Sequence, residues 1–181
     1  MIILQEIKTC HKSYHFAEEL LHTAFPENER RDDKMQRWNT DNEERFHCLL
    51  ALDGETPIGL LTYWHFNTFI YIEHFAIDEV LRGKGYGKEV LHLFSDAHFP
   101  TPIVLEVEQP TDDISHRRIN FYTNCGLKIW KCDYRQPPYR KSDNWFPMYL
   151  MTTPTLTYEK DYQHIRDSIY HAVYGIQDTF H

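Results

Sequence analysis

The sequence predicts one α/β (α+β) domain, and three observations lead to that fold class. A β-branched and aromatic run at 69–78 is followed by a glycine-rich turn and by an apolar-periodic stretch at 86–97, which is the pattern of a buried strand, a loop and an amphipathic helix. Apolar segments at 45–52 and 58–66 flank Asp53-Gly54, a dipeptide typical of hairpin turns. With 181 residues, 41% of them hydrophobic, the chain can form one compact core.

The remaining elements follow from the same periodicities. We expect further strands at 2–7, 103–108, 127–134 and 145–152, and further helices at 14–25, 28–38, 113–124 and 157–175. The first of these helices should end before Pro26. The last helix carries a stripe of apolar and aromatic residues on one face, namely Tyr158, Tyr162, Ile165, Ile169 and Val173. This stripe predicts packing on the same domain, with a homodimer contact as the alternative.

A glycine-rich loop with three cations follows the strand at 69–78. Its sequence is R-G-K-G-Y-G at 82–87, and its glycines and neighbouring cations are Gly83, Gly85, Gly87, Arg82, Lys84 and Lys88. We expect the glycines to take positive φ and to leave unpaired backbone N–H groups at the positive end of the next helix. Such a loop is typical of phosphate binding, and three cations in an acidic chain favour a pyrophosphate over a carboxylate. The alternative is a helix entry that binds no ligand.

Two well-known phosphate-binding motifs do not fit this loop. A Walker A loop would need glycine at Arg82 and Ser or Thr at Glu89. A dinucleotide fingerprint would need glycine at Val90 or Lys88, depending on its start. The pattern that fits is R-x-x-G-x-G at 82–87, directly after a strand that carries an acidic residue. This pattern resembles the acyl-CoA pyrophosphate loop of the GNAT N-acetyltransferase superfamily.

The resemblance extends along most of the chain. After the loop and its helix come a strand at 103–108 and a helix that ends in F-Y-T-N-C-G-L at 121–127, similar to the family pattern F-Y-x-x-x-G-F, with Leu127 in place of Phe. The segment A-F-P-E-N-E-R at 24–30 resembles a GNAT opening segment. The resemblance implies a GNAT-like, mixed and mostly antiparallel central sheet flanked by helices. The acyltransferase domain would span 1–153, and an extra C-terminal helical extension, 154–181, would pack on it.

The resemblance also implies an acetyl-CoA co-substrate, whose acetyl group would pass to a primary amine by direct attack in a ternary complex. Cofactor contacts would come from the loop, from the end of the preceding strand and from the helix at 113–124. The implied cofactor-binding residues are Ala76, Ile77, Arg82, Gly83, Lys84, Gly85, Tyr86, Gly87, Lys88, Ser115 and Arg118. Ser115 and Arg118 stand where the family often has Asn and Ala, so this helix departs from the family pattern.

Acyl transfer to an amine requires a proton acceptor, because only the free base attacks a thioester. Glu73 is the first candidate, since it shares a strand face with Ile77 and the family often places a base, or a water-linked base, on this strand. Glu108, at the end of the strand at 103–108, is the second candidate, and water is the third. The alternative for Glu73 is a solvent-facing or salt-bridged strand acid.

The departing thiolate requires a proton donor, and Tyr122 is the candidate. Its family counterpart lies beside the CoA sulfur, and a phenol with a pKa of about 10 is protonated at neutral pH. The alternative for Tyr122 is a packing role in the core. The oxyanion also needs donors, and the resemblance implies backbone N–H groups near Ala76 and Ile77.

Charge and hydropathy limit the partners. A formal net charge of -8 argues against nucleic-acid binding, which requires a basic face, and favours a cationic amine as the acceptor. No segment approaches the roughly 18 to 20 apolar residues of a membrane span, and the N-terminus has no features of a secretory leader. We therefore expect a cytoplasmic protein without a membrane or nucleic-acid partner.

Cysteine and histidine patterns indicate neither disulfides nor a metal site. Four cysteines (10, 48, 125 and 132) lack CxxC spacing, so reduced thiols are expected. His11 and His15 lie four apart on a predicted helix, but no further ligand follows at metal spacing. His74 should point to the face opposite Glu73 and is not assigned to catalysis. The absence of G-x-S-x-G gives no support to a hydrolase triad.

The acceptor itself is not specified by any motif. Aromatic residues that would line its site, or would equally well pack in the core, are Trp38, Tyr63, Trp64, Tyr134, Tyr139 and Trp145. The segment Q-P-P-Y-R at 136–140 is a candidate loop over that site. The acceptor is therefore a small-molecule or peptide amine of unidentified structure. A different function remains open, that of a non-catalytic module that binds or senses acyl-CoA on the same fold.

Overall fold

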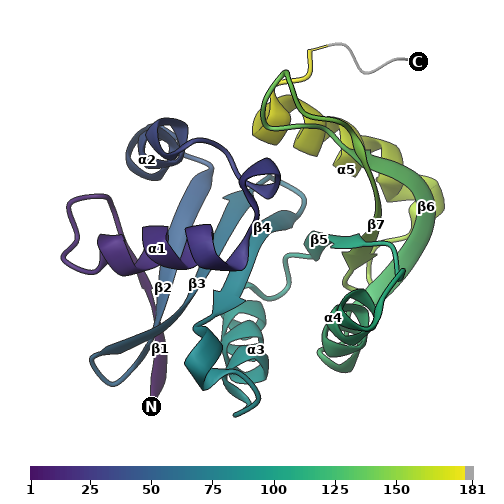
Figure 1. Cartoon of the computed structure of the whole chain (residues 1–181). Helices are drawn as coiled ribbons and strands as arrows, with labels where there is room; N and C mark the ends of the chain where they lie inside the picture. Colours follow the sequence, from purple (N-terminus) through teal and green to yellow (C-terminus); the bar gives the residue numbers. More distant parts are fainter. Residues whose placement is uncertain (178–181) are drawn as a thin grey trace. The chain divides into compact units, whose positions relative to one another are not determined.

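A computed structural model describes residues 1–177 of the chain (Figure 1). These residues form two compact units, one of Met1–His65 with Ile72–Pro100 and one of Phe66–Tyr71 with residues 101–177. The described part contains seven strands and five α-helices, and its strand pairings are mostly antiparallel. The predicted mixed α/β fold class is therefore confirmed. Residues 178–181 of the predicted C-terminal extension lie outside the described residues.

The first unit is an antiparallel sheet covered by helices. Its strands are β1 (Ile2–Glu6), β2 (Phe46–Asp53), β3 (Thr56–His65) and β4 (Ile70–Ile77), and the first two residues of β4 belong to the second unit. Its helices are α1 (Tyr14–Ala24), η1 (Glu27–Glu29), α2 (Asp33–Asn42), η2 (Glu79–Leu81) and α3 (Tyr86–His98). The strands lie in the order β1-β2-β3-β4. Helix α1 crosses β3 (Figure 1), and α3 contacts β1.

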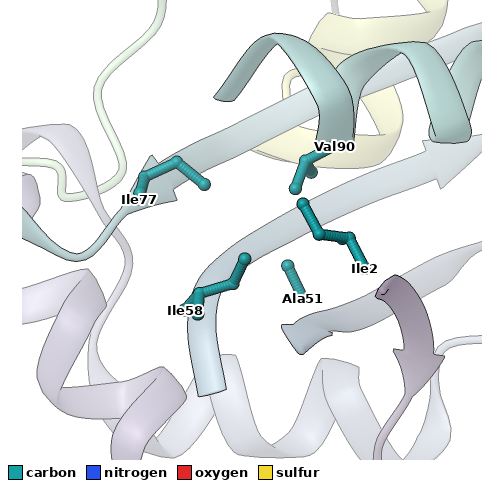
Figure 2. Close-up of a cluster of buried hydrophobic side chains, with 5 residues drawn as sticks. All are labelled: Ile2, Ala51, Ile58, Ile77 and Val90. Carbon is teal, nitrogen blue, oxygen red and sulfur yellow. The ribbon is translucent and has the colours of Figure 1, made fainter. Parts of the chain in front are cut away.

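A cluster of buried aliphatic side chains fixes the start of α3 against the sheet. It contains one residue from each strand of the first unit and one from α3, namely Ile2, Ala51, Ile58, Ile77 and Val90 (Figure 2). Leu81 and Tyr86 pack against this cluster from the two sides of the glycine-rich loop. Burial of such side chains contributes about 1.5 to 3 kcal/mol each. The loop is therefore held at both of its ends by the core of the unit.

The second unit consists of three antiparallel strands and two helices. The strands are β5 (Ile103–Glu108), β6 (Lys128–Gln136) and β7 (Phe146–Thr152), in the order β5-β7-β6, and the helices are α4 (Asp113–Asn124) and α5 (Tyr158–Tyr174). Both pairings of β7 are antiparallel. Helix α4 contacts β5 and β6. Alternate residues of β6 are buried, as expected for a strand with one covered face.

Helix α5 packs on β6 of its own unit. Its predicted apolar stripe is largely buried, with Ile165, Ile169 and Val173 among the core residues. Tyr162 donates a hydrogen bond to the carbonyl oxygen of Asp133 at 3.1 Å, and Tyr170 donates one to the carbonyl of Arg135. The two tyrosine hydroxyls thus tie α5 to β6, while Tyr158 of the predicted stripe remains 42% exposed.

Two local predictions were wrong. The helix expected at 28–38 begins at Asp33 and ends at Asn42, because the side chain of Asp32 accepts a hydrogen bond from the backbone of Met35 at 2.8 Å and caps the helix there. His11 was expected on the same helix as His15, but it precedes α1, which begins at Tyr14. Its ring nitrogen accepts a hydrogen bond from the backbone of Ser13.

Among residues 1–177, no helix combines the length and the apolar composition needed to cross a bilayer.

Candidate active site

The glycine-rich loop turns into α3 through two left-handed residues. Gly83 has φ 79° and Gly85 has φ 88°, and Gly85 is the N-cap of α3. A side chain at either position would be strained by this backbone conformation, although it would meet no atom within 4 Å. Gly87 is the second residue of α3 and is not among the positive-φ glycines of the described chain. The prediction of positive φ at Gly87 was therefore wrong, because the helix has already begun there.

A row of backbone donors lines the start of α3. Within the described part of the chain, the N–H groups of residues 83–88 have no acceptor. The N–H groups of Leu81 and Arg82 donate to Asp78 and Glu79 instead, and the first intrahelical bond runs from Glu89 to Gly85 at 3.2 Å. Six consecutive donors thus stand at the positive end of a 13-residue helix. This arrangement suits an anion with several oxygen atoms.

The side chains of the loop divide into exposed cations and one structural tyrosine. Lys84 and Lys88 are exposed, and Arg82 uses its Nε to donate to the carbonyl oxygen of Ile77 at 3.0 Å. Tyr86 donates its hydroxyl to Asp53 at 2.9 Å, which ties the start of α3 to the β2–β3 turn. Tyr86 therefore offers the loop its backbone N–H, whereas its side chain serves the fold.

Gly59, a residue that sequence reasoning missed, allows β3 to approach the end of β4. A Cβ atom at Gly59 would lie 2.8 Å from the carbonyl oxygen of Ala76 and 2.7 Å from Cδ1 of Ile77. The end of the Ile77 side chain could move aside, but the carbonyl oxygen of Ala76 is backbone, so a side chain at Gly59 would require a shift of the backbone. An isolated glycine within a strand pattern is a recognised signal of close backbone approach, and it was available in the sequence at 58–66.

Glu73 lies in a buried ion pair. Its carboxylate accepts two hydrogen bonds from the guanidinium of Arg31, one of them at 3.0 Å, and a third from the indole of Trp64 at 2.9 Å. The side chains of Arg31 and Glu73 are 5% and 0% exposed. Burial would raise the pKa of Glu73, but the Arg31 charge and these hydrogen bonds hold that pKa below its ordinary value. This is the salt-bridged strand acid of the alternative interpretation, and a carboxylate so neutralised is a poor proton acceptor.

His74, on the opposite face of β4, is also buried and hydrogen-bonded. Its Nε2 lies 2.9 Å from the carbonyl oxygen of Glu29, and its Nδ1 lies 3.4 Å from the hydroxyl of Thr62. Burial lowers the pKa of His74, so the ring is neutral at physiological pH. His74 binds the Glu29 end and Glu73 binds the Arg31 end of the segment 29–31. Both ends of this segment are therefore attached to β4.

Tyr122, in the second unit, lies near the end of α4. Its side chain is buried, and burial raises the pKa of its phenol to about 12. The phenol therefore carries its proton throughout the physiological range. The carbonyl oxygen of Tyr122 accepts a hydrogen bond from Leu127 at 3.0 Å, across a turn in which Gly126 has φ 92°. The F-Y-x-x-x-G-L pattern thus closes the end of the helix.

The two other predicted residues of α4 are engaged within the second unit. Ser115 forms a capping box with Asp112, in which each side chain bonds the backbone of the other residue. Arg118 pairs with Glu108 at 3.3 Å, and both side chains are about two-fifths exposed. The structure thus brings together Glu108 and Arg118, which were predicted for two different roles.

The chain matches the model of a known protein family. The model of the acetyltransferase (GNAT) family matches residues 10–127. The chain belongs to the GNAT acetyltransferase family. The resemblance inferred from the sequence and the predicted acyltransferase class are thereby confirmed.

The chain is also similar to several solved structures of acetyltransferases. One from Bacteroides thetaiotaomicron is 44% identical, with a TM-score of 0.93, and the match covers 97% of this chain and 99% of that chain. The Bacillus subtilis acetyltransferase in complex with CoA is 18% identical, with a TM-score of 0.58 and coverage of 84% and 98%. The Escherichia coli ribosomal-protein-S18-alanine N-acetyltransferase is also 18% identical, with a TM-score of 0.60 and coverage of 87% and 96%. The last two show the fold alone. Among curated proteins, no significant match is found.

Several aromatic residues expected near the acceptor of this GNAT protein have packing roles. Tyr63 stacks on His47 and contacts Phe94 and His98 beneath α3, and Trp64 is the buried donor to Glu73. Trp38 and Trp145 remain 53% and 42% exposed. The ring of Tyr139 lies 5.0 Å from that of Tyr174. A lining role at the acceptor site stays a prediction for the exposed members of this set.

The described part of this GNAT chain contains neither a cluster of metal-binding side chains nor a disulfide. No group of three or more His, Cys, Asp or Glu side chains is placed to hold a metal ion among residues 1–177. The four cysteines are free thiols, and burial raises the pKa of Cys48 to about 12.

Proposed function

We propose that this chain is an N-acetyltransferase that binds acetyl-CoA through the loop at 82–88 and transfers the acetyl group to a primary amine. The observation that carries this proposal is the row of unused N–H groups at residues 83–88, which stands at the positive end of α3 beside exposed cations. A pyrophosphate has the oxygen atoms and the charge that this row would bind. Family membership supports acetyl-CoA as the source of that pyrophosphate.

The proposed chemistry is direct attack of the neutral amine on the thioester carbonyl. The new C–N bond forms as the C–S bond breaks, the amine nitrogen loses a proton, and the CoA thiolate gains one. Backbone N–H groups near Ala76 and Ile77 are proposed to bind the oxyanion. Tyr122 is proposed to protonate the thiolate, and its pKa of about 12 supports this role because the proton is present at neutral pH.

The proton acceptor is proposed to be Glu108 or a water molecule. The buried ion pair with Arg31 favours a positioning role for Glu73, which would hold the segment from Glu29 to Arg31 against β4. Glu108 is about two-fifths exposed, so it can exchange protons with solvent. It belongs to the same unit as Tyr122. Ser115 and Arg118 are proposed to contact the cofactor from the start of α4.

The chain is proposed to form a single acyltransferase domain in the cytoplasm. Residues 1–153 would form the acyltransferase domain, and the C-terminal extension would be part of the same domain, supported by the packing of α5 on β6. A cytoplasmic location is supported by four free thiols, which are typical of a reducing compartment.

A thiol-release assay with acetyl-CoA and a panel of primary amines tests the proposed function. We expect CoA binding by calorimetry and amine-dependent release of CoA thiol. CoA binding without turnover on any amine would favour the alternative, a non-catalytic acyl-CoA sensing module. Absence of CoA binding would contradict both functions.

A further inference from the structure

The side chain of Tyr86 makes a long-range contact that the N–H row of the loop does not require. Tyr86 is the first residue of α3, and its hydroxyl donates a hydrogen bond to Oδ2 of Asp53, 33 residues earlier in the chain, at 2.9 Å. Its ring packs against the buried aliphatic cluster of the first unit. The bond to Asp53 raises the pKa of Tyr86 above its ordinary value, so the hydroxyl is a donor throughout the physiological range. The start of α3 is therefore fixed by both a polar and an apolar contact of one side chain.

Asp53 is an acceptor whose position is set by the sheet. It is the last residue of β2 and pairs with Ile2 on β1 and with Thr56 on β3. Its other oxygen, Oδ1, lies 3.0 Å from the backbone nitrogen of Met1. Because strands hold Asp53 on both sides, its position is set by strand pairing and not by the backbone conformation of Gly54, the next residue. The sheet thus provides α3 with a fixed anchor.

The loop that precedes this contact has few other restraints. Gly83 and Gly85 take positive φ, and glycine has more conformational freedom to lose than any other residue. In the described part of the chain, no backbone acceptor holds the N–H groups of the loop. The other end of the loop is held by Arg82, whose Nε donates to the carbonyl oxygen of Ile77 at 3.0 Å. Two side chains, Arg82 and Tyr86, therefore fasten the two ends of the loop to the ends of strands.

We propose that Tyr86 and Asp53 are positioning residues, which hold the N–H row at 83–88 in the arrangement that binds the pyrophosphate of CoA. The proposal rests on the proposed function, since it concerns the same loop. A donor row that is ordered before the ligand arrives binds more tightly, because less conformational entropy is lost on binding. Neither side-chain group needs to touch the cofactor. Loss of their bond should therefore weaken the pyrophosphate contacts and leave the rest of the cofactor site unchanged.

Ligand-observed NMR titration with CoA and with pantetheine tests this proposal. Pantetheine is the thiol-bearing part of CoA without the pyrophosphate and the nucleoside, and we call the ratio of the two affinities the CoA preference. Tyr86→Phe keeps the ring on the aliphatic cluster and removes only the hydroxyl, so the CoA preference should fall about fivefold, as one hydrogen bond allows. Asp53→Ala should give a similar fall. The double variant should lose no more than either single variant, because the two side chains share one bond.

Tyr63→Phe is the matched control, because the Tyr63 hydroxyl lies 3.3 Å from Nε2 of His98, the last residue of α3. This variant removes a hydroxyl contact at the opposite end of the same helix and should keep the CoA preference within about twofold. An unchanged preference in Tyr86→Phe, an equal loss of CoA and pantetheine affinity, or additive losses in the double variant would overturn the proposal. Absence of CoA binding by the wild type would instead refute the proposed function, and this proposal with it.

Discussion

Individual residues of this protein show how burial decides chemical roles that a motif leaves open. Glu73 and Glu108 are both strand carboxylates, yet Glu73 is fully buried against Arg31, whereas Glu108 is partly exposed beside Arg118. The sequence placed Glu73 on the correct strand but contained no sign of Arg31 as its partner, because 42 residues separate the two. Long-range pairs of this kind depend on the folded topology and not on local pattern.

Removal of the Glu73 charge should destabilise the protein strongly. Glu73→Gln would leave the buried Arg31 guanidinium without its ionic partner on β4, which typically costs about 3 to 5 kcal/mol. Chemical denaturation measures the change. Glu18→Gln is the control, because it breaks a pair in which the Arg37 side chain is 56% exposed, so the loss of stability should be smaller. Unchanged stability of Glu73→Gln together with a large loss of turnover would restore Glu73 as the base.

His74 should titrate at a lower pH than a free histidine, because burial lowers its pKa. Its pKa is lowered by burial, so folding stability from the neutral ring is present above the unfolded pKa of about 6.5 and is lost as pH falls below it. NMR titration of the histidine ring protons should show that the midpoint of His74 lies below that of a free histidine, which is about 6.5. A normal titration of His74 in the folded protein would show that the buried arrangement is absent.

Tyr122→Phe should separate an acid from a packing residue. The substitution keeps the buried ring and removes only the hydroxyl, so stability and CoA affinity should hold. The single-turnover rate should fall by less than about 10²-fold, because a thiolate leaves comparatively easily and gains modestly from protonation. An unchanged rate would assign Tyr122 to packing alone.

The secondary-structure elements were the part of the molecule most readable from sequence. Strand and helix periods placed β2, β3, β4, α3 and β5 close to their observed bounds, and the hairpin turn at Asp53-Gly54 was found from its dipeptide. The start of α2 was missed because the capping signal at Asp32 was not used. Gly59 was missed for a related reason, since its role depends on a neighbouring strand.

Gly59→Ala should disturb the end of β4. The added methyl group would overlap the carbonyl of Ala76, so we expect a loss of about 1 to 3 kcal/mol in stability and weaker CoA binding. Gly54→Ala is the control, because Gly54 has φ 62° but open space around its Cβ position. It should lower stability without changing CoA affinity. Equal CoA affinity in Gly59→Ala and the wild type would show that the approach of β3 to β4 has no bearing on the cofactor.

At the scale of the whole molecule, the sequence predicted the fold class and the family but only part of the site. The loop at 82–88 could be predicted as a candidate cofactor site because the proposed function depends on local backbone geometry. The hydrogen bond between Tyr174 and Glu106 was not predicted, because 68 residues separate the two and each residue alone is an ordinary helix or strand residue. Sites made of adjacent residues are readable from sequence, whereas those assembled by topology require the structure.

The loop at 82–88 is the proposed site of the CoA pyrophosphate, and calorimetry with CoA on a matched pair of variants tests this role most directly. Gly85→Val and Gly54→Val both place a side chain on a left-handed backbone with open space, at φ 88° and 62°. Only Gly85 lies in the row of unused N–H groups. We predict that Gly85→Val loses CoA binding by about 10-fold or more, as expected when several N–H contacts are displaced, while Gly54→Val binds like the wild type. Equal CoA affinity of Gly85→Val and the wild type would contradict the account.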